Sequence, residues 1–331
     1  MVQQRITAEP ESLVMAGDLG GTNFRLALVT RTGEIIRRLT LPTPKGKGAD
    51  HLLDRMAAAI LGLMEEEGII PGRLQAVGMG IAGLIQPDKG RVVKSPNIPE
   101  LDWIWLGPEL RRRLPWPVTI DNDANLFALG EHYQGAGRGE DNLLGLTLGT
   151  GVGGGLILNG RLWQGAGGPS AEVGHITIDP EGERCSCGNQ GCLETLASAT
   201  WTVRWTAERL AAGQKSLLQK NWRENPEGLS ALTIYQAATA GDALAQKAFQ
   251  RVGRALGIAI ADVVHLLGIP LIIIGGNFAQ SWDRFIGPLR EELERRLTFF
   301  PAAKLVIRPA ALGDNGGLLG AARLAWMQVS C

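Results

Sequence analysis

The fold is decided by the stretch Gly17-Asp18-Leu19-Gly20-Gly21-Thr22-Asn23, which follows the short apolar run 13–16. β-rich residues resume over 24–29, and a turn at 31–33 leads to another strand pattern over 34–41. This order predicts a strand, a glycine-rich turn, a second strand, a tight turn and a third strand.

The same order returns in the second half of the chain. The apolar run 143–148 enters Gly149-Thr150-Gly151-Val152-Gly153-Gly154-Gly155, and the next strand, over 156–158, ends at Asn159-Gly160. Asn-Gly is a strong signal for a two-residue hairpin. The pattern of the first half is therefore repeated.

A helix and a glycine-ended strand follow in each half. Apolar residues over 52–64 have the spacing of one helix face, and 243–267 has the pattern of a longer helix. The next strands end in Gly80-Ile-Ala-Gly83 and in Gly275-Gly276-Asn277. Many α/β proteins have strands that end in glycine, but the matched order favours a duplication. We expect two α/β lobes from duplicated βββαβα halves, with a cleft between them.

Composition excludes several other classes of protein. The 331 residues carry no net charge, so a basic surface for nucleic acid is not indicated. No stretch approaches the roughly 18 apolar residues of a membrane span. Residues 1–11 are polar and lack the pattern of a signal peptide. We expect a cytoplasmic protein that binds neither nucleic acid nor membrane.

Each glycine-rich turn has the small residues that let a backbone approach phosphate closely. Neither is a Walker A loop, and β residues follow both, unlike the helix that follows a dinucleotide-binding turn. A plain hairpin turn is the alternative for each, and turn stabilisation is the alternative for Asp18. As a pair at matched positions they favour phosphate binding, with Asp18 near a Mg²⁺. The candidates are Asp18, Gly20, Gly21, Thr22, Asn23, Thr150 and Gly151.

Polar residues also follow the short strand 118–120, in the order Asp121-Asn122-Asp123-Ala124-Asn125. They could simply cap the helix that begins there. One cap uses one residue, however, and four candidates are present. A carboxylate at this junction can accept the proton of a hydroxyl that attacks phosphorus. We assign this role to Asp123 and expect Asn122 to orient the same substrate.

Three of the four cysteines cluster at Cys185, Cys187 and Cys192. Glu172-Val-Gly-His175 precedes them and Glu194 follows. Three thiolates and one imidazole form a Cys₃His set, which is common in closed zinc sites. The alternative is three free thiols. Cys331, the last residue, is expected to take no part.

Together these motifs resemble the ROK family of sugar kinases and repressors, and most closely its bacterial glucokinases. The resemblance runs from Asp18 to about residue 325. The cysteine motif, ten residues after Glu-x-Gly-His, is its most specific part.

The resemblance implies an actin-like, hexokinase-type (ribonuclease H-like) fold. Residues 1–122, completed by 312–331, would form a small lobe, and 123–311 a large lobe with the zinc loop. It further implies ATP-dependent phosphorylation of glucose to glucose 6-phosphate, with Mg²⁺, a structural Zn²⁺ and a homodimer or larger homo-oligomer.

Asp123 is similar to the general base of the family. Gly275, Gly276 and Asn277 would lie near the adenosine. The sugar-binding candidates are Gly83, Asn97, Asn122, Asp123, Glu172, His175 and Glu194, and His175 would also bind zinc.

Two alternatives remain open. A kinase for fructose, mannose or N-acetylmannosamine would share nearly every motif. A sugar-sensing protein without catalysis is disfavoured because Asp123 is present. About a dozen residues precede Leu13, fewer than the DNA-binding module of the repressors needs, so we expect no such module.

Overall fold

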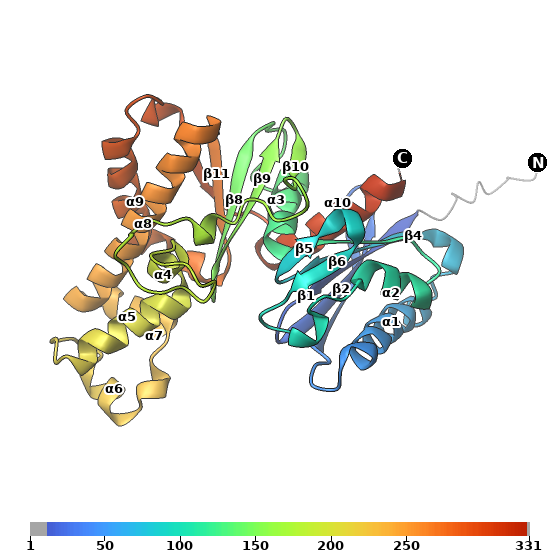
Figure 1. Ribbon diagram of the computed structural model, residues 1–331, viewed down its shortest axis with the longest axis horizontal. Coiled ribbons are helices and arrows are strands. Elements are labelled where there is room, and N and C mark those ends of the chain that lie inside the picture. Colours follow the sequence, from blue (N-terminus) through green and yellow to red (C-terminus); the bar gives the residue numbers. More distant parts are fainter. Residues whose placement is uncertain (1–11, 330–331) are drawn as a thin grey trace, which may run out of the picture. The chain divides into compact units, whose positions relative to one another are not determined.

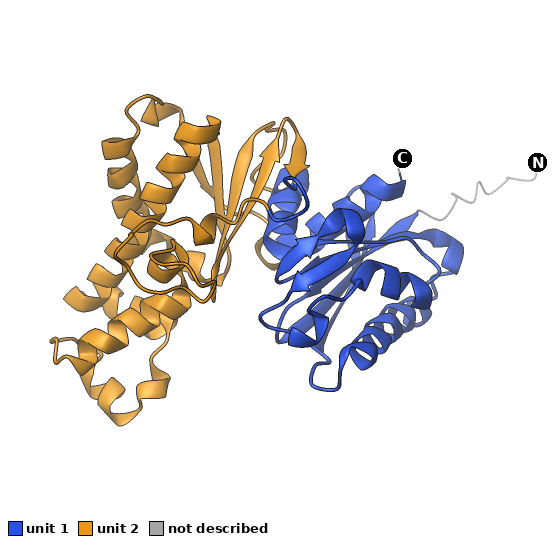
Figure 2. Ribbon diagram, in the orientation of Figure 1, with its two compact units in different colours: residues 1–134, 164–169, 315–331 blue, residues 135–163, 170–314 orange. Residues whose placement is uncertain are grey.

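The computed structural model describes residues 12–329. It contains two compact units (Figures 1 and 2). Unit 1 takes in the chain up to residue 134, residues 164–169 and those from 315 onward, and unit 2 comprises 135–163 and 170–314. Two sequence-based expectations, on a signal peptide in 1–11 and on Cys331, lie outside the described residues.

Unit 1 contains a five-stranded mixed sheet in the order β3-β2-β1-β4-β7. Strands β1 to β3 are successive antiparallel neighbours, whereas β4 and β7 run parallel to β1. The strands of unit 1 are β1 (Leu13–Leu19), β2 (Asn23–Thr30), β3 (Ile35–Pro42), β4 (Leu74–Ile81) and β7 (Val118–Asn122), with a separate pair, β5 (Leu84–Gln86) and β6 (Arg91–Lys94). Its helices are α1 (Ala49–Glu66), α2 (Leu106–Arg113), α3 (Asp123–Gln134) and α10 (Gly316–Val329).

Helices cover both faces of this sheet. Val77 and Met79 of β4 belong to one buried cluster with Leu52 and Met56 of α1. Gly78, between them, faces the other way, because a Cβ there would lie 2.0 Å from the Ala321 carbonyl oxygen of α10. Side chains alternate between the faces of a strand, so β4 is buried on both.

Helices α3 and α10 touch backbone to backbone. A Cβ on Gly130 of α3 would lie 2.0 Å from the Gly316 carbonyl oxygen, and one on Gly320 of α10 would lie 1.8 Å from that of Leu126. This packing explains why unit 1 continues to residue 134, beyond the boundary at 122 expected from the sequence.

Unit 2 repeats the strand topology, in the order β10-β9-β8-β11-β12. The duplicated α/β fold predicted from the sequence is confirmed. Its strands are β8 (Leu143–Leu148), β9 (Val152–Leu158), β10 (Arg161–Trp163), β11 (Leu271–Gly275) and β12 (Val306–Pro309). Its helices are α4 (Glu194–Ala197), α5 (Ala199–Ala211), α6 (Gln219–Glu224), α7 (Ala231–Thr239), α8 (Ala243–Leu267) and α9 (Trp282–Arg296).

Local signals account for many of these elements. The predicted helix over 243–267 coincides with α8. Asn159 and Gly160 have φ of 51° and 71° between β9 and β10, as a type I′ turn requires. Asp242 caps α8, since its Oδ1 accepts a hydrogen bond from the Ala245 N–H at 2.8 Å.

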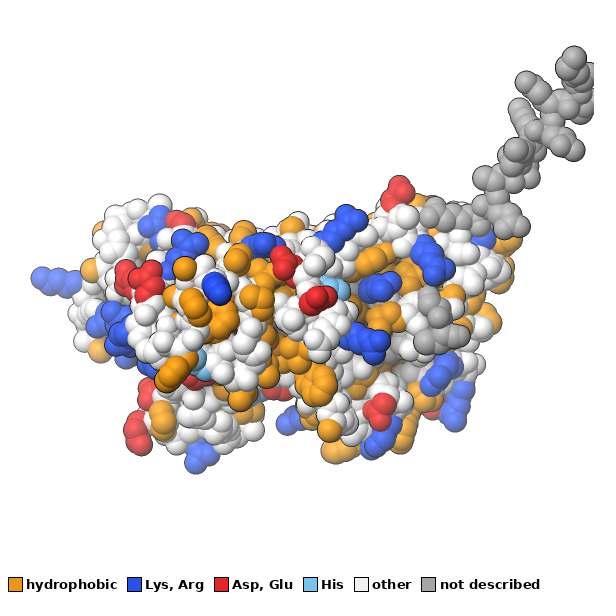
Figure 3. All heavy atoms as spheres, turned by 90° about the horizontal axis from the view of Figure 1, so that it is seen from above, with side chains coloured by type: hydrophobic (Ala, Val, Ile, Leu, Met, Phe, Trp, Pro, Cys, Tyr) orange, Lys and Arg blue, Asp and Glu red, His pale blue; other side chains and the backbone are white. Residues whose placement is uncertain are grey.

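Charged side chains are scattered rather than segregated on the face of the protein shown in Figure 3, in keeping with the zero net charge. Within residues 12–329, the helices are all too short or too polar to cross a bilayer.

The contact between α3 and α10 gives a stability prediction. Gly320→Ala should lower the free energy of unfolding by about 1–3 kcal/mol, because the new methyl group overlaps a main-chain carbonyl that cannot rotate away. Chemical denaturation monitored by circular dichroism measures the change.

Gly62→Ala in α1 is the matched control, since a Cβ there meets nothing within 4 Å. It should leave stability unchanged or raise it by up to about 1 kcal/mol. Equal stability of the Gly320→Ala variant and the wild type would contradict the close helix contact.

Candidate active site and metal centre

The parallel strands of unit 1 bring several predicted residues to one edge of its sheet. Leu19 of β1 pairs with Ile81 of β4, and Ile81 pairs with Asn122 of β7. All three strands end here. The turn 20–23, Gly83 and Asp123 therefore leave the sheet at the same edge, where α/β proteins bind their ligands.

Two of the polar residues after β7 have different local roles. Oδ1 of Asn122 accepts hydrogen bonds from the N–H groups of Ala124 (2.8 Å) and Asn125 (3.1 Å), so Asn122 caps α3. Its Nδ2 donates to the Gly83 carbonyl oxygen at 2.9 Å. Asp123 begins the helix with an exposed side chain, and its Oδ1 accepts from the Ala124 N–H at 3.0 Å.

Sequence reasoning gave no role to Asp121, which is fully buried. Its Oδ1 accepts from the Asn122 N–H (2.7 Å) and from Asn125 Nδ2 (2.9 Å), and its Oδ2 accepts from Gln164 Nε2 (2.5 Å). Desolvation raises the pKa of Asp121, and these donors lower it in part. Asp121 thus anchors the turn in which Asp123 stands. The partners Asn122 and Asn125 belong to the local motif. The third partner, Gln164, is distant in the sequence and could not be predicted from that motif.

The turn 20–23 is closed by the Gly20 N–H, which donates to the Asn23 carbonyl oxygen at 3.0 Å. Thr43 fixes it from β3's end, because its Oγ1 donates to the Gly20 carbonyl oxygen at 2.6 Å. Thr22 and Asn23 are exposed, as a ligand-binding role needs.

Asp18 lies on β1 beneath this turn and is almost fully buried. Its carboxylate forms an ion pair with Arg25, the residue opposite on β2. Arg25 was not among the residues predicted for the site. The alternation of β2 could have placed it on the same face as Asp18.

Gly21 and Gly83 bring the Ser95–Asn97 segment to this edge. A Cβ on Gly21 would lie 2.7 Å from the Asn97 Cβ, and one on Gly83, at φ 146°, would lie 2.2 Å from the Lys94 carbonyl oxygen. Ser95 Oγ donates to the Ala82 carbonyl oxygen at 2.8 Å. Asn97, with an exposed side chain, thus adjoins the glycine-rich turn.

The second glycine-rich turn lies at the corresponding edge of the unit 2 sheet. Its Gly149 N–H donates to the Gly151 carbonyl oxygen at 3.0 Å. Gly276, after β11, is so close that a Cβ would lie 2.4 Å from the Leu148 carbonyl oxygen. Thr150, Gly276 and Asn277 are exposed, so the two segments form one glycine-rich surface.

Glu172, His175 and Glu194 lie close enough for their charges to interact. Loss of surrounding solvent raises the pKa of Glu172, His175 partly opposes this, and Glu194 adds to it. Glu194 Oε2 accepts from the Val152 N–H at 3.1 Å, directly after the 149–151 turn. The carboxylate is thereby fixed beside that turn.

The Cys₃His set converges on one point. The possible ligand atoms of His175, Cys185, Cys187 and Cys192 all lie within 4.8 Å of one another. Cys187 Sγ and Cys192 Sγ are 3.7 Å apart, and Cys185 Sγ lies 3.7 Å from His175 Nδ1. Tetrahedral Zn–S bonds place two sulfurs about 3.8 Å apart, so the spacing fits zinc.

The thiols are free rather than disulfide-bonded. Burial raises the pKa of Cys192 to about 12, and its hydrogen bonds with Cys187 and Cys185 add to this. Without a metal this thiol stays protonated at neutral pH. A bound metal ion would displace the proton, since thiolates are the form that binds.

Comparison with known proteins gives matches over almost the whole chain. The sequence model of the ROK family matches residues 14–328. Glucokinase from Thermotoga maritima is 37% identical, with 95% of this chain and 98% of that protein covered. N-acetylmannosamine kinase from Yersinia pestis is 32% identical, with 96% and 98% covered.

One solved structure is similar to this chain in both fold and sequence. It is a ROK family glucokinase from Streptomyces griseus in complex with glucose and AMPPNP. The TM-score is 0.80 and the identity 33%, with 96% of this chain and 100% of that chain covered.

The geometry of the Cys₃His set predicts about one zinc per chain in purified, tag-free protein. Cys187→Ser should reduce the zinc content and lower the thermal midpoint, because the binding energy of a structural ion is partly folding energy. Elemental analysis and differential scanning calorimetry measure both. Ser186→Ala, the exposed neighbour, is the control. Fully stable wild-type protein without metal would refute the site.

Proposed function

The chain belongs to the ROK family, and on this premise we propose that it is an ATP-dependent glucokinase that forms glucose 6-phosphate. The observation that carries the proposal is the exposed carboxylate of Asp123 at the carboxyl end of β7. It leaves the sheet at the same edge as the glycine-rich turn 20–23. A base and a phosphate-binding turn on one edge are what transfer to a hydroxyl needs.

Asp123 acts as the general base in the proposed reaction. The oxygen of the primary hydroxyl of the sugar forms a bond to the γ-phosphorus, and the bond from that phosphorus to the bridging oxygen of ATP breaks. The hydroxyl proton passes to the Asp123 carboxylate, and ADP leaves. Asp121, buried and held by three donors, keeps Asp123 at the end of β7.

Each unit has residues that can bind hydroxyl groups of the sugar. Unit 1 supplies Asn122, whose Nδ2 has a second N–H beyond the one bonded to Gly83, together with Asn97 and the backbone of Gly83. Unit 2 supplies Glu172, His175 and Glu194. His175 Nδ1 lies 3.7 Å from Cys185 Sγ, which leaves Nε2 for the sugar.

Each glycine-rich turn offers backbone N–H groups to the phosphates of ATP, and Thr22, Asn23 and Thr150 add exposed side chains. Gly275, Gly276 and Asn277 adjoin the second turn and take the adenosine side. Mg²⁺ would neutralise charge on the phosphates. Asp18 is suited to contact the Mg²⁺ ion through a water molecule rather than directly, because its carboxylate is already paired with Arg25.

Zinc has a structural role in this proposal. Its ligands His175 and Cys192 lie within three residues of Glu172 and two residues of Glu194, respectively, so the ion fixes the segments that carry the sugar ligands. We further propose a cytoplasmic enzyme, where ATP is available and thiols stay reduced, and a homodimer or larger homo-oligomer. Sedimentation velocity tests the assembly.

Asp123→Asn tests the base. Asn keeps an oxygen for the Ala124 N–H but cannot take a proton, so kcat should fall by about 10²–10⁴ with little change in the KM for glucose. Asp88→Asn, at an exposed position of the same unit, is the control. A near-normal kcat in folded Asp123→Asn protein would exclude Asp123 as the base.

A hexose panel tests the substrate. Initial rates with ATP and Mg²⁺ should give the highest kcat/KM for glucose among glucose, fructose, mannose and N-acetylmannosamine. The last belongs in the panel because one relative is named for it. A higher kcat/KM for another hexose would reassign the substrate. Glucose binding without transfer to any sugar would instead indicate a sensor.

A further inference from the structure

Helix α4 is a single turn, Glu194–Ala197. It connects three parts of unit 2, namely the 149–151 turn, the cysteine loop and helix α8. Its first residue, Glu194, accepts the Val152 N–H beside the 149–151 turn. Thr195, which is buried, donates through Oγ1 to the Cys192 carbonyl oxygen at 2.8 Å. The place of this turn of helix therefore sets the place of the Glu194 carboxylate.

The carbonyl end of α4 lacks the usual main-chain partners. The Ser198 N–H bonds to the Glu194 carbonyl oxygen, while the Ala199 N–H bonds to that of Gly149. The next helix, α5, begins after Ser198, whose extended backbone interrupts the helical run. The carbonyl oxygens of Thr195 and Leu196 consequently need donors from elsewhere, as the last carbonyls of any helix do.

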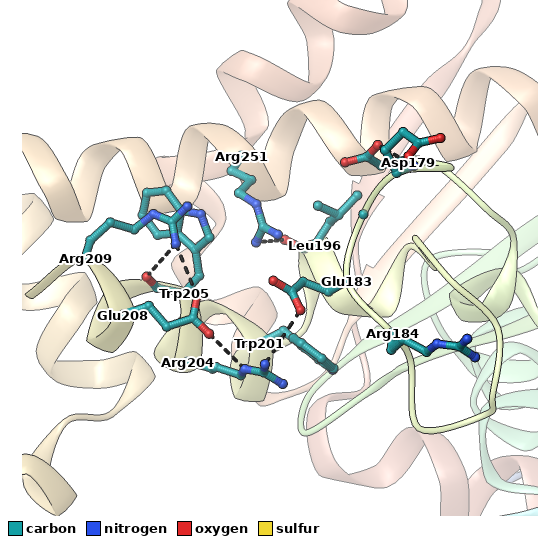
Figure 4. Close-up of a pocket in the computed structure, with 12 residues that line it drawn as sticks. Asp179, Glu183, Arg184, Leu196, Trp201, Arg204, Trp205, Glu208, Arg209 and Arg251 are labelled. Carbon is teal, nitrogen blue, oxygen red and sulfur yellow. Dashed lines mark hydrogen bonds and ion pairs between the residues drawn. The ribbon is translucent and has the colours of Figure 1, made fainter. Parts of the chain in front are cut away.

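Arg251 of α8 supplies those donors, and Figure 4 shows the one to Leu196. Its Nη2 donates to the Thr195 carbonyl oxygen at 3.1 Å, and its Nη1 approaches that of Leu196 at 3.5 Å. The guanidinium also forms a cation–π contact with Trp205, because Arg251 Cζ lies over the indole ring, 5.7 Å from its centroid. A guanidinium is suited to this task because its N–H groups form a rigid fork.

Acidic residues near Arg251 attract it without forming an ion pair with it. It lines a cavity of about 490 Å³ in which arginines and acidic residues are equal in number. Glu183 and Glu208 are held by Arg204, at 3.6 and 3.0 Å, and within residues 12–329 Arg251 has no carboxylate at ion-pair distance. Burial lowers the pKa of Arg251 to about 10 and Arg209 adds to this, whereas Glu183, Asp179 and Glu208 oppose it, so the group is still charged at neutral pH.

We propose that Arg251 is a positioning residue for sugar binding, acting through α4 on the carboxylate of Glu194. The inference rests on the proposed function for the role of Glu194, whereas the anchoring of α4 stands on the geometry of unit 2. Loss of the guanidinium frees the carbonyl end of α4. Glu194 then loses its fixed place beside the 149–151 turn.

Arg251→Met, which keeps the length of the side chain without the donors, tests the proposal. It should lower kcat/KM for glucose by about tenfold to a hundredfold, as small misplacements of a positioning group do. Most of the loss should lie in the KM for glucose, with zinc content unchanged. Arg251→Lys, which can donate to one carbonyl, should recover part of it. Arg254→Met, at an exposed position of the same helix, should match the wild type.

A double-mutant cycle separates positioning from general stability. In a Glu194→Gln background, Arg251→Met should reduce kcat/KM at least about threefold less than in the wild type, because both changes remove the same fixed carboxylate. Fully multiplicative losses, or an equal loss in Arg254→Met, would overturn the proposal.

Amide hydrogen exchange supplies a readout that needs no substrate. The segment 193–199 should exchange faster in Arg251→Met than in the wild type or in Arg254→Met, because α4 loses its anchor. Unchanged exchange would refute the anchoring, whatever the activity. Wild-type protein that transfers phosphate to no hexose would refute the proposed function, while faster exchange in that case would still support the anchoring of α4.

Discussion

The candidate site depends on main-chain segments that lie directly against one another. A Cβ on Gly174 would lie 2.0 Å from the Val152 carbonyl oxygen, and one on Gly191 would lie 1.5 Å from that of Asp179. Only glycine permits such contact, and Gly191 also has φ of 68°, which favours glycine. These contacts hold the Glu172–His175 segment on β9 and fold the cysteine loop, so the positions of the polar groups follow from them.

Polar anchors then fix what close packing has brought together. A short path of hydrogen bonds runs from β9 through α4 to α8. It begins at the Val152 N–H, passes through Glu194 and ends at Arg251. In unit 1, Asp121 plays the comparable part for the turn at Asp123. In both units a group expected to touch substrate is held by a buried or partly buried neighbour that does not, which limits the freedom of the reactive side chain.

Much of this could be predicted because its causes are local. Strand alternation, the Asn159-Gly160 turn and the helix spacing over 52–64 each depend on residues close in sequence, and the structure has an element at each place. The order of the elements, repeated in both halves, was enough to give the duplicated α/β arrangement, and the resemblance to the ROK family gave the hexokinase-type fold. The cysteine cluster likewise indicated one metal site from spacing alone.

The sequence by itself determined the duplicated strand order, the two glycine-rich turns and the cluster of three cysteines with His175. Only the tertiary structure decided how the polar run 121–125 divides its work, with Asp121 buried, Asn122 as the helix cap and Asp123 exposed. It alone brought Arg251 to the carbonyl end of α4, 55 residues away. The physical reason is that helix and strand patterns arise from neighbouring residues, whereas burial and hydrogen-bond partners depend on which distant segments pack together.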